Sequence, residues 1–312
     1  MASFEHLSLN FEKRGLVMSR ERLCAECIGC LLRKHVEKYP EGATEEQKLA
    51  CLQAILKSLS EAPSSYSGPI MMRDIEAIRA GFFGASSSGY AEIKKHYNGV
   101  MLEREESVRE KVKAADEKLK LAIQYAMTGN YIDFGAMKDV DENYLTELLD
   151  KAYEANVSEK QYAALKSDLA KAQKLVYLTD NCGEVVMDKI LIETIKELYP
   201  QIDITVIVRG KEIVNDVTME DATQVGLTDI VKVIGNGSDV AGTFLEEISS
   251  EALAEINAAD VIMAKGQGNY ETLRGCGKNI YYMFLCKCDL FANVFNVPRF
   301  TAMLVNDITG VL

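Results

Sequence analysis

The fold is decided by one stretch of the sequence, which reads Lys174-Leu-Val-Tyr-Leu-Thr179 and continues Asp180-Asn-Cys-Gly-Glu184. The first part is typical of a short buried strand, and apolar residues then recur with helical spacing over residues 185–198. An Asp and an Asn therefore lie at the carboxyl end of a strand, where ligands bind in open α/β sheets. Their oxygen atoms suit a divalent cation and the helix N-terminus beside them attracts an anion, which suggests phosphate chemistry.

The remainder of the C-terminal half repeats this alternation. Strands are expected at residues 175–179, 204–208, 230–234, 261–264 and 280–285, and helices at residues 185–198, 220–225, 243–256 and 269–273. Strands separated by helices predict a mainly parallel sheet. Residues 20–169 show helical periodicity almost throughout. We therefore expect an α/β protein in which a helical region, residues 1–168, packs on a Rossmann-like α/β/α sandwich, residues 169–312.

The composition narrows the possible functions. Of the 312 residues, 48% are hydrophobic and 26% are charged, which is ordinary for a globular protein. The formal net charge of −12 argues against a nucleic-acid surface. There is no apolar run near the roughly 20 residues of a membrane helix and no signal-peptide pattern in residues 1–10. Eight cysteines then favour reduced thiols in a cytoplasmic protein without membrane partners. The oligomeric state stays open.

Polar clusters follow three of the predicted strands. The first contains Asp180 and Asn181, the second contains Asn215 and Asp216, and the third reads Lys265-Gly-Gln-Gly-Asn-Tyr-Glu271. Parallel strands bring such loops to one edge of the sheet, so the clusters can converge on one pocket. A single cluster is more often a helix cap or an ordinary loop, but three clusters at three strand ends favour a functional site.

The chemistry of the clusters is complementary. Asp180, Asn181 and Asp216 can supply oxygen ligands to a Mg²⁺- or Mn²⁺-like ion, with Ni²⁺ or Co²⁺ as alternatives. Lys265 can neutralise a phosphoryl oxygen, and the glycines at 266 and 268 let backbone N–H groups approach it closely. We therefore expect Asp180, Asp216 and Lys265 to carry the catalysis.

Short motifs occur in a defined order along the chain. They read Cys27-x-x-Cys30, Gly129-Asn-x-Ile-Asp-Phe-Gly135, Asp180-Asn-x-Gly-Glu184, Asn215-Asp-Val-Thr-x-x-Asp221 and Lys265-Gly-Gln-Gly-Asn-Tyr-Glu271, with Tyr90, Lys94 and Asn98 between the first two. In this order they resemble the metal-dependent damage-control phosphatases, formerly domain-of-unknown-function family eighty-nine, in the branch with N-terminal cysteines. Ser88-Gly89 departs from the family's Asp-Pro before the tyrosine, which bears on substrate choice.

The resemblance implies one bound divalent metal ion and hydrolysis of phosphate monoesters of small metabolites, such as damaged or side-product sugar phosphates. The implied metal ligands are Asp180, Asn181 and Asp216. Phosphate and substrate contacts are expected from residues of the other motifs: Glu184, Asn130, Asp133, Gln267, Gly268, Asn269 and Glu271. Either Asp180 or Glu184 could act as the general base.

The cysteines Cys24-x-x-Cys27-x-x-Cys30 allow two interpretations. Three thiols on one helix face could form a structural zinc site, with Cys286 or Cys288 as the fourth ligand. Equally, they could be small buried apolar residues.

Two other functions are alternatives to the phosphatase. The first is a Rossmann-like carboxyl methyltransferase with an adenosyl cofactor, although Asn181-Cys-Gly183 is poor in glycine for such a loop. The second is a non-catalytic metal- or thiol-binding protein. A phosphorylated Asp180, as in haloacid-dehalogenase-like enzymes, is disfavoured because Cys182 stands where those enzymes carry a second Asp.

Overall fold

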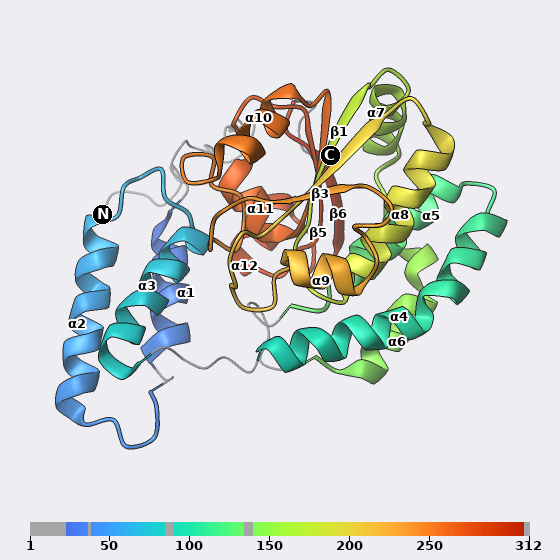
Figure 1. Ribbon diagram of the computed structural model, residues 1–312. Helices are drawn as coiled ribbons and strands as arrows, with labels where there is room; N and C mark the ends of the chain where they lie inside the picture. Colours follow the sequence, from blue (N-terminus) through green and yellow to red (C-terminus); the bar gives the residue numbers. More distant parts are fainter. Residues whose placement is uncertain (1–22, 37–38, 85–89, 134–139, 309–312) are drawn as a thin grey trace, which may run out of the picture.

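The computed structural model describes residues 23–36, 39–84, 90–133 and 140–308. The sequence predictions for residues 1–10, for Ser88 and Gly89, and for residues 134–135 of the Gly-Asn-x-Ile-Asp-Phe-Gly motif lie outside these ranges. Within them, the expected α/β fold with a mainly parallel sheet is confirmed (Figure 1).

One six-stranded sheet lies at the centre, in the order β3-β2-β1-β4-β5-β6. The strands are β1 Lys174–Leu178, β2 Asp203–Val208, β3 Lys232–Gly235, β4 Val261–Lys265, β5 Ile280–Leu285 and β6 Ala302–Asn306. The first five are parallel, and β6 runs antiparallel to β5 with Tyr282 opposite Val305. The strand order reverses between β1 and β4, and a ligand crevice opens at the carboxyl ends of strands at such a point.

The helices account for most of the remaining described chain. They are α1 Ala25–Val36, α2 Glu45–Glu61, α3 Gly68–Phe83, α4 Tyr90–Ala114, α5 Lys118–Gly129, α6 Glu142–Asp150, the 3₁₀ turn η2 Ala152–Glu154, α7 Glu159–Leu169, α8 Glu184–Leu198, α9 Met219–Gln224, α10 Ser250–Ala258, α11 Gly266–Leu273 and α12 Asp289–Phe295. None of these described helices is both long and apolar enough to cross a bilayer.

Both faces of the sheet are covered, which explains why its strands read as apolar runs rather than as alternating patterns. In β1, Leu175 and Tyr177 belong to one core, under α4, α5 and α8. Val176 and Leu178 belong to a second core, under α10, α11 and α12 (Figure 1). Each strand is thus fixed from two sides, and so are the loops at its carboxyl end.

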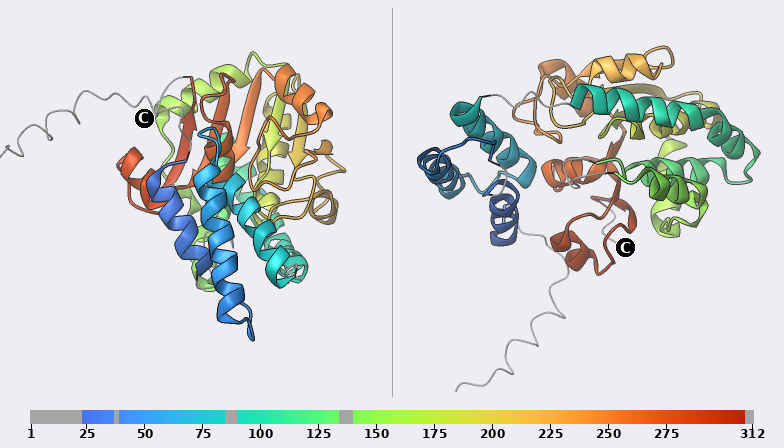
Figure 2. Two further views of the ribbon diagram at one scale, coloured as in Figure 1. Left: turned by 90° about the vertical axis from the view of Figure 1, so that its left-hand side faces the viewer. Right: turned by 90° about the horizontal axis from the view of Figure 1, so that it is seen from below.

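The helices α1, α2 and α3 form a small bundle at one side of the sheet (Figures 1 and 2). The bundle has its own core, which includes Leu31, Ile55 and Ile75. Its helix α3 touches α11. By contrast, α4 and α5 share the core of the sheet. The predicted domain boundary at residue 168 falls at the end of α7 and stays a prediction.

Three elements differ most from the sequence prediction. The helix expected at residues 243–256 begins only at Ser250, because Thr243 is held to α11: its N–H donates to Oγ1 of Thr272 (2.9 Å) and its hydroxyl donates to Asn269 (2.8 Å). The short helix α12 and the edge strand β6 were not predicted at all. The start of α10 and the strand β6 depend on pairing with distant segments, which local periodicity does not encode.

Candidate active site

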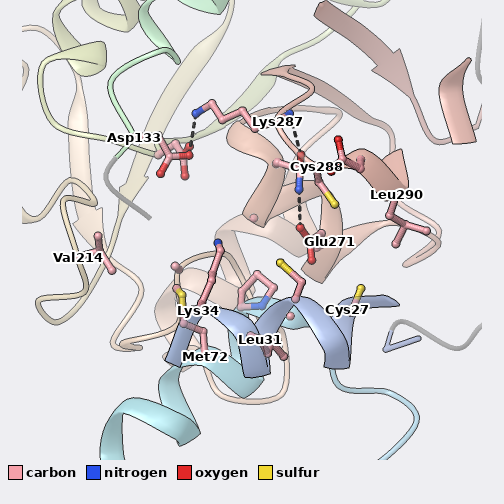
Figure 3. A pocket seen from close by; sticks show the side chains of 18 of the residues that line it. Cys27, Leu31, Lys34, Met72, Asp133, Val214, Glu271, Lys287, Cys288 and Leu290 are labelled. Atoms are coloured by element: carbon pink, nitrogen blue, oxygen red, sulfur yellow. Dashed lines mark hydrogen bonds and ion pairs between the residues drawn. The ribbon is translucent and has the colours of Figure 1, made fainter. Parts of the chain in front are cut away.

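A pocket of about 380 Å³ lies where the reversal of strand order predicts a crevice. It is lined by residues that follow β1, β2, β4 and β5 and, from the opposite side, by residues of α1 (Figure 3). A volume of this size suits a small molecule.

The three predicted metal ligands meet in this pocket. Asp180, Asn181 and Asp216 are all buried and all line it. The loops after β1 and β2 are joined by a backbone bridge between Asn181 and Asp216, and the N–H of Val217 donates to the carbonyl of Asp180 (2.8 Å). Asn181 Nδ2 donates to Asp180 Oδ2 at 2.7 Å, which leaves the amide oxygen of Asn181 as its ligand atom.

The donor chemistry of this set fits a hard divalent cation. In the described part of the chain, no three His, Cys, Asp or Glu side chains are arranged to hold a metal ion by themselves. The set here combines two carboxylates with an amide, and Mg²⁺ or Mn²⁺ is commonly held by such oxygen atoms together with water and substrate.

Arg209, which the sequence analysis missed, contacts the carboxylates of both Asp180 and Asp216. Its Nε donates to Asp216 Oδ2 at 2.7 Å, and its guanidinium lies 3.6 Å from Asp180 Oδ1. Burial raises the pKa of Asp180 well above its usual value, and the neighbouring Glu184 and Asp216 carboxylates raise it further, against the effect of Arg209. Burial also raises the pKa of Asp216 to about 6, although Arg209 lowers it. A bound cation would relieve this excess of negative charge.

Glu184 and Asn130 were expected to contact substrate, but neither lines the pocket. Glu184 Oε2 accepts hydrogen bonds from Asn130 (2.9 Å) and from the Asn181 amide (3.1 Å), and Asn130 also donates to Asp180 Oδ2 at 3.0 Å. Both residues therefore orient Asp180 and Asn181. Of the two candidate bases, only Asp180 faces the pocket.

Lys265 lies in a different place from the one expected. Its side chain is fully buried, and its ammonium contacts Glu184 Oε1, Asp188 Oδ1 (2.7 Å) and the carbonyl of Ala126 (2.7 Å). An ammonium group has three donors, so all of them have partners and none is directed at a phosphoryl group. The expectation of a direct phosphate contact is corrected to a structural role beneath Glu184.

Among the cationic side chains that line the pocket, Lys287 lies nearest in the chain to a strand end, two residues after β5. Its ammonium lies 2.7 Å from Oδ2 of Asp133, and Asp133 is the one residue of the expected Asn130/Asp133 pair that reaches the pocket (Figure 3). Lys34 on α1 also lines the pocket. The sequence signal for Lys287 was its place just after a strand.

The segment after β4 contributes one wall. Gln267, Gly268 and Glu271 line the pocket as expected, and Gln267 Nε2 donates to Glu271 at 2.8 Å. Asn269 does not line it: its amide donates to the carbonyls of Thr179 (3.1 Å) and of Lys265 (2.7 Å), so it ties the end of β1 to α11. Its expected substrate contact is therefore corrected to a positioning role.

Helix α4 contacts both the segment after β1 and the segment after β2. Lys94 forms an ion pair with Asp221 at 2.7 Å, and Asn98 donates to the same carboxylate at 3.1 Å. The Oδ1 atom of Asn98 accepts a hydrogen bond from the N–H of Gly183 at 2.6 Å. These contacts give the polar residues of this helix a structural role: they fix the segments after β1 and β2 relative to each other.

Among the residues that the structure describes, the cysteines do not form a group of three or more side chains arranged to hold a zinc ion. Cys27, Cys30 and Cys288 line the same pocket, but they are not among any metal-holding group in the described structure. Cys286 is buried in the core of the sheet.

Comparisons with known proteins identify the family of this chain. The family model of the damage-control phosphatase ARMT1-like domain matches residues 23–303. A damage-control phosphatase of Pyrococcus horikoshii is 32% identical over 88% of this chain and 94% of its own length. An uncharacterised protein of Methanocaldococcus jannaschii is 33% identical over 84% of this chain and 88% of its own length.

A solved structure extends the agreement to three dimensions. The crystal structure of a DUF89 family protein from Pyrococcus horikoshii superposes on the chain with a TM-score of 0.70 at 26% identity, and covers 91% of this chain and 99% of that one. The match of motifs, length and fold leads to one conclusion: the chain belongs to the damage-control phosphatase family with the ARMT1-like domain.

Proposed function

We propose that this protein is a metal-dependent phosphatase that hydrolyses phosphate monoesters of small metabolites, such as damaged or side-product sugar phosphates. The observation that carries the proposal is the convergence of Asp180, Asn181 and Asp216 in one pocket with the ammonium of Lys287. Family membership and the relatives named as damage-control phosphatases support the reaction type.

Asp180, Asn181 and Asp216 would hold the divalent ion. When bound, such an ion polarises a phosphoryl oxygen and lowers the pKa of a coordinated water. The protein contributes a fixed geometry for this chemistry. Asn130 and Glu184 orient the ligand side chains, and Arg209 keeps the two carboxylates from repelling each other.

Lys287 would attract and orient the anionic phosphoryl group. It lines the pocket together with Lys34, so cations line the pocket both from the segment after β5 and from α1. Charges placed before the reaction stabilise the transition state without reorganisation. Asp180 is the candidate base, because its carboxylate faces the pocket whereas Glu184 is engaged by Lys265.

The pocket also limits the substrate. A cavity of about 380 Å³ admits a sugar phosphate and excludes a polymer from the inner part of the site. Gln267 and Glu271 present an amide and a carboxylate along one wall, and such groups suit the hydroxyls of a sugar.

The test is phosphate release from a panel of sugar phosphates, with Mg²⁺, Mn²⁺, Ni²⁺ or Co²⁺ added to chelator-treated protein. We expect metal-dependent release by the wild type and by Asp203→Asn, which changes an exposed carboxylate at the amino end of β2. Asp180→Ala should release none. If no ester is hydrolysed and an adenosyl cofactor binds in calorimetry, the methyltransferase alternative is favoured instead.

A further inference from the structure

The start of α1 carries two thiols in contact with each other. Cys24 directly precedes the helix and Cys27 lies in its first turn. Their Sγ atoms are 3.5 Å apart, and both side chains are partly exposed. Cys51 and Cys182, by comparison, are fully buried, as small apolar residues are. Cys24 and Cys27 are thus accessible and paired, which a purely apolar role does not require.

The geometry suits a disulfide. A disulfide bond is about 2.05 Å long and joins residues whose Cα atoms are roughly 4.4–6.8 Å apart. Residues three apart at the start of a helix lie on one face, so rotation of the two side chains can close the remaining gap. Since none of the described cysteines belongs to a group that could hold a metal ion, a thiol–thiol reaction fits this pair better than a zinc site does.

We propose that Cys24 and Cys27 are a redox-active dithiol that reacts with a small-molecule disulfide of the glutathione class. The Cys24 thiolate attacks one sulfur of that disulfide, forms a mixed disulfide and releases the first thiol. Cys27 then attacks the Cys24 sulfur and releases the second thiol. Two protein thiols are oxidised to one disulfide, the external disulfide is reduced to two thiols, and the two protons pass to the released thiols.

The order of attack follows from the surroundings of the two sulfur atoms. Burial raises the pKa of Cys27 to about 12, the backbone hydrogen bond of Cys24 opposes this shift, and the nearby Glu271 carboxylate adds to it. Thiolates are the attacking species in disulfide exchange. Cys27 is therefore the resolving cysteine, which needs only to react with a sulfur already held beside it, and Cys24 attacks first.

The disulfide would be formed at the wall of the pocket. Cys27 lines the pocket from α1, on the side opposite the strand ends (Figure 3). When the disulfide forms, the sulfur of Cys27 turns toward Cys24, and the shape of the pocket wall at α1 changes. An effect of this change on catalysis would depend on the proposed phosphatase function, whereas formation of the disulfide would not.

The experiment uses the full chain, reduced and then incubated in mixtures of oxidised and reduced glutathione. Free thiols are blocked and the cysteine pairs are mapped by mass spectrometry of peptides. We expect one reversible disulfide, between Cys24 and Cys27. Cys27→Ser should retain one glutathione on Cys24, because the resolving thiol is missing. Cys24→Ser should react with glutathione at least about tenfold more slowly.

Cys30→Ser is the matched control, since it removes the next thiol of the same helix and should leave the Cys24–Cys27 disulfide intact. Circular dichroism establishes that each variant is folded. A disulfide between Cys30 and Cys288 in place of this pair, glutathione retained on the wild type, or thiols blocked by bound zinc would each overturn the proposal. The readout is a mapped disulfide and does not depend on phosphatase activity. The failure of this proposal can therefore be distinguished from the failure of the proposed function.

Discussion

Lys265 is fully buried and stabilises the fold through its ion pairs. Its ammonium lies between the buried carboxylates of Glu184 and Asp188. Lys265→Met would leave both without a counter-ion, so the free energy of unfolding should fall by about 3–5 kcal/mol. In the control Lys232→Met, the lost pair with Glu255 involves a lysine that is 50% exposed, so the loss of stability should be much smaller. Urea denaturation measures both, and equal losses would contradict this account.

Asp188 gives the buried network a pH dependence. Burial raises the pKa of Asp188 from 3.8 to about 7, although Lys265 lowers it. The folded state therefore binds this proton more tightly than the unfolded chain does. The resulting stabilisation is complete below the unfolded pKa and is lost as the pH rises through the folded pKa. Asp188→Asn removes this effect, so the stability of the wild type relative to the variant should fall between about pH 4 and pH 7. Urea denaturation at a series of pH values checks it, and a constant or rising difference would count against it.

Lys287 is the lysine whose loss should affect turnover. Its ammonium lines the pocket, so Lys287→Ala removes a preorganised positive charge and should lower kcat/KM on the order of a hundredfold. The control Lys211→Ala changes an exposed lysine that does not line the pocket and should leave kcat/KM unchanged. Steady-state kinetics with the best sugar phosphate compare them. If the two variants match the wild type, Lys287 does not contact the phosphoryl group.

At the scale of single residues, the sequence placed Asp180, Asn181 and Asp216 in one pocket because strand-end loops converge. It misplaced Lys265, the last residue of β4. Every residue of β4 is buried, so the pattern does not show which way the final side chain points. Lys287 was missed for a different reason, because its neighbours in the sequence form no acidic or glycine-rich motif.

At the scale of elements, apolar runs were enough to predict β1 to β5. In β1, β4 and β5 these runs reflect burial on both faces of the sheet. The start of α10, the helix α12 and the strand β6 were not predicted. Thr243 forms hydrogen bonds with α11 instead of starting a helix. The strand β6 pairs with the edge of β5 that would otherwise lack a neighbour. Both depend on partners distant in the sequence.

The turn from β4 into α11 places a specific demand on one glycine. Gly266 has φ +78°, and a Cβ there would lie 1.9 Å from Oδ2 of Asp180. Gly275 has φ +74° and open space around its Cβ position. Alanine at either position bears the strain of a left-handed backbone, about 1–2 kcal/mol. Only Gly266→Ala should also displace Asp180 and abolish metal-dependent phosphate release. Thermal unfolding and activity assays of both variants test this, and an active Gly266→Ala enzyme would contradict it.

At the scale of the whole molecule, the pocket depends on two parts of the chain that the sequence does not place relative to each other. The segments after the strand ends supply Lys287 and the residues proposed as metal ligands, and α1 and α3 of the bundle supply the opposite wall (Figures 1 and 3). The helical periodicity of residues 20–169 predicted the helices, but it does not show that α1 covers the site while α4 and α5 pack on the sheet. Which helices cover the site and which pack on the sheet depends on how the apolar faces of the helices pack against one another and against the sheet.

We expect hydrolysis to depend on a divalent ion held by Asp180, Asn181 and Asp216. This is tested by titrating chelator-treated protein with Mn²⁺ while bound metal and phosphate release are followed together. We expect one ion per chain, activity that rises in proportion to occupancy, and loss of both in Asp216→Ala but not in Asp203→Asn. Full phosphate release by metal-free protein, or unchanged Mn²⁺ binding by Asp216→Ala, would show that these residues do not hold a catalytic ion.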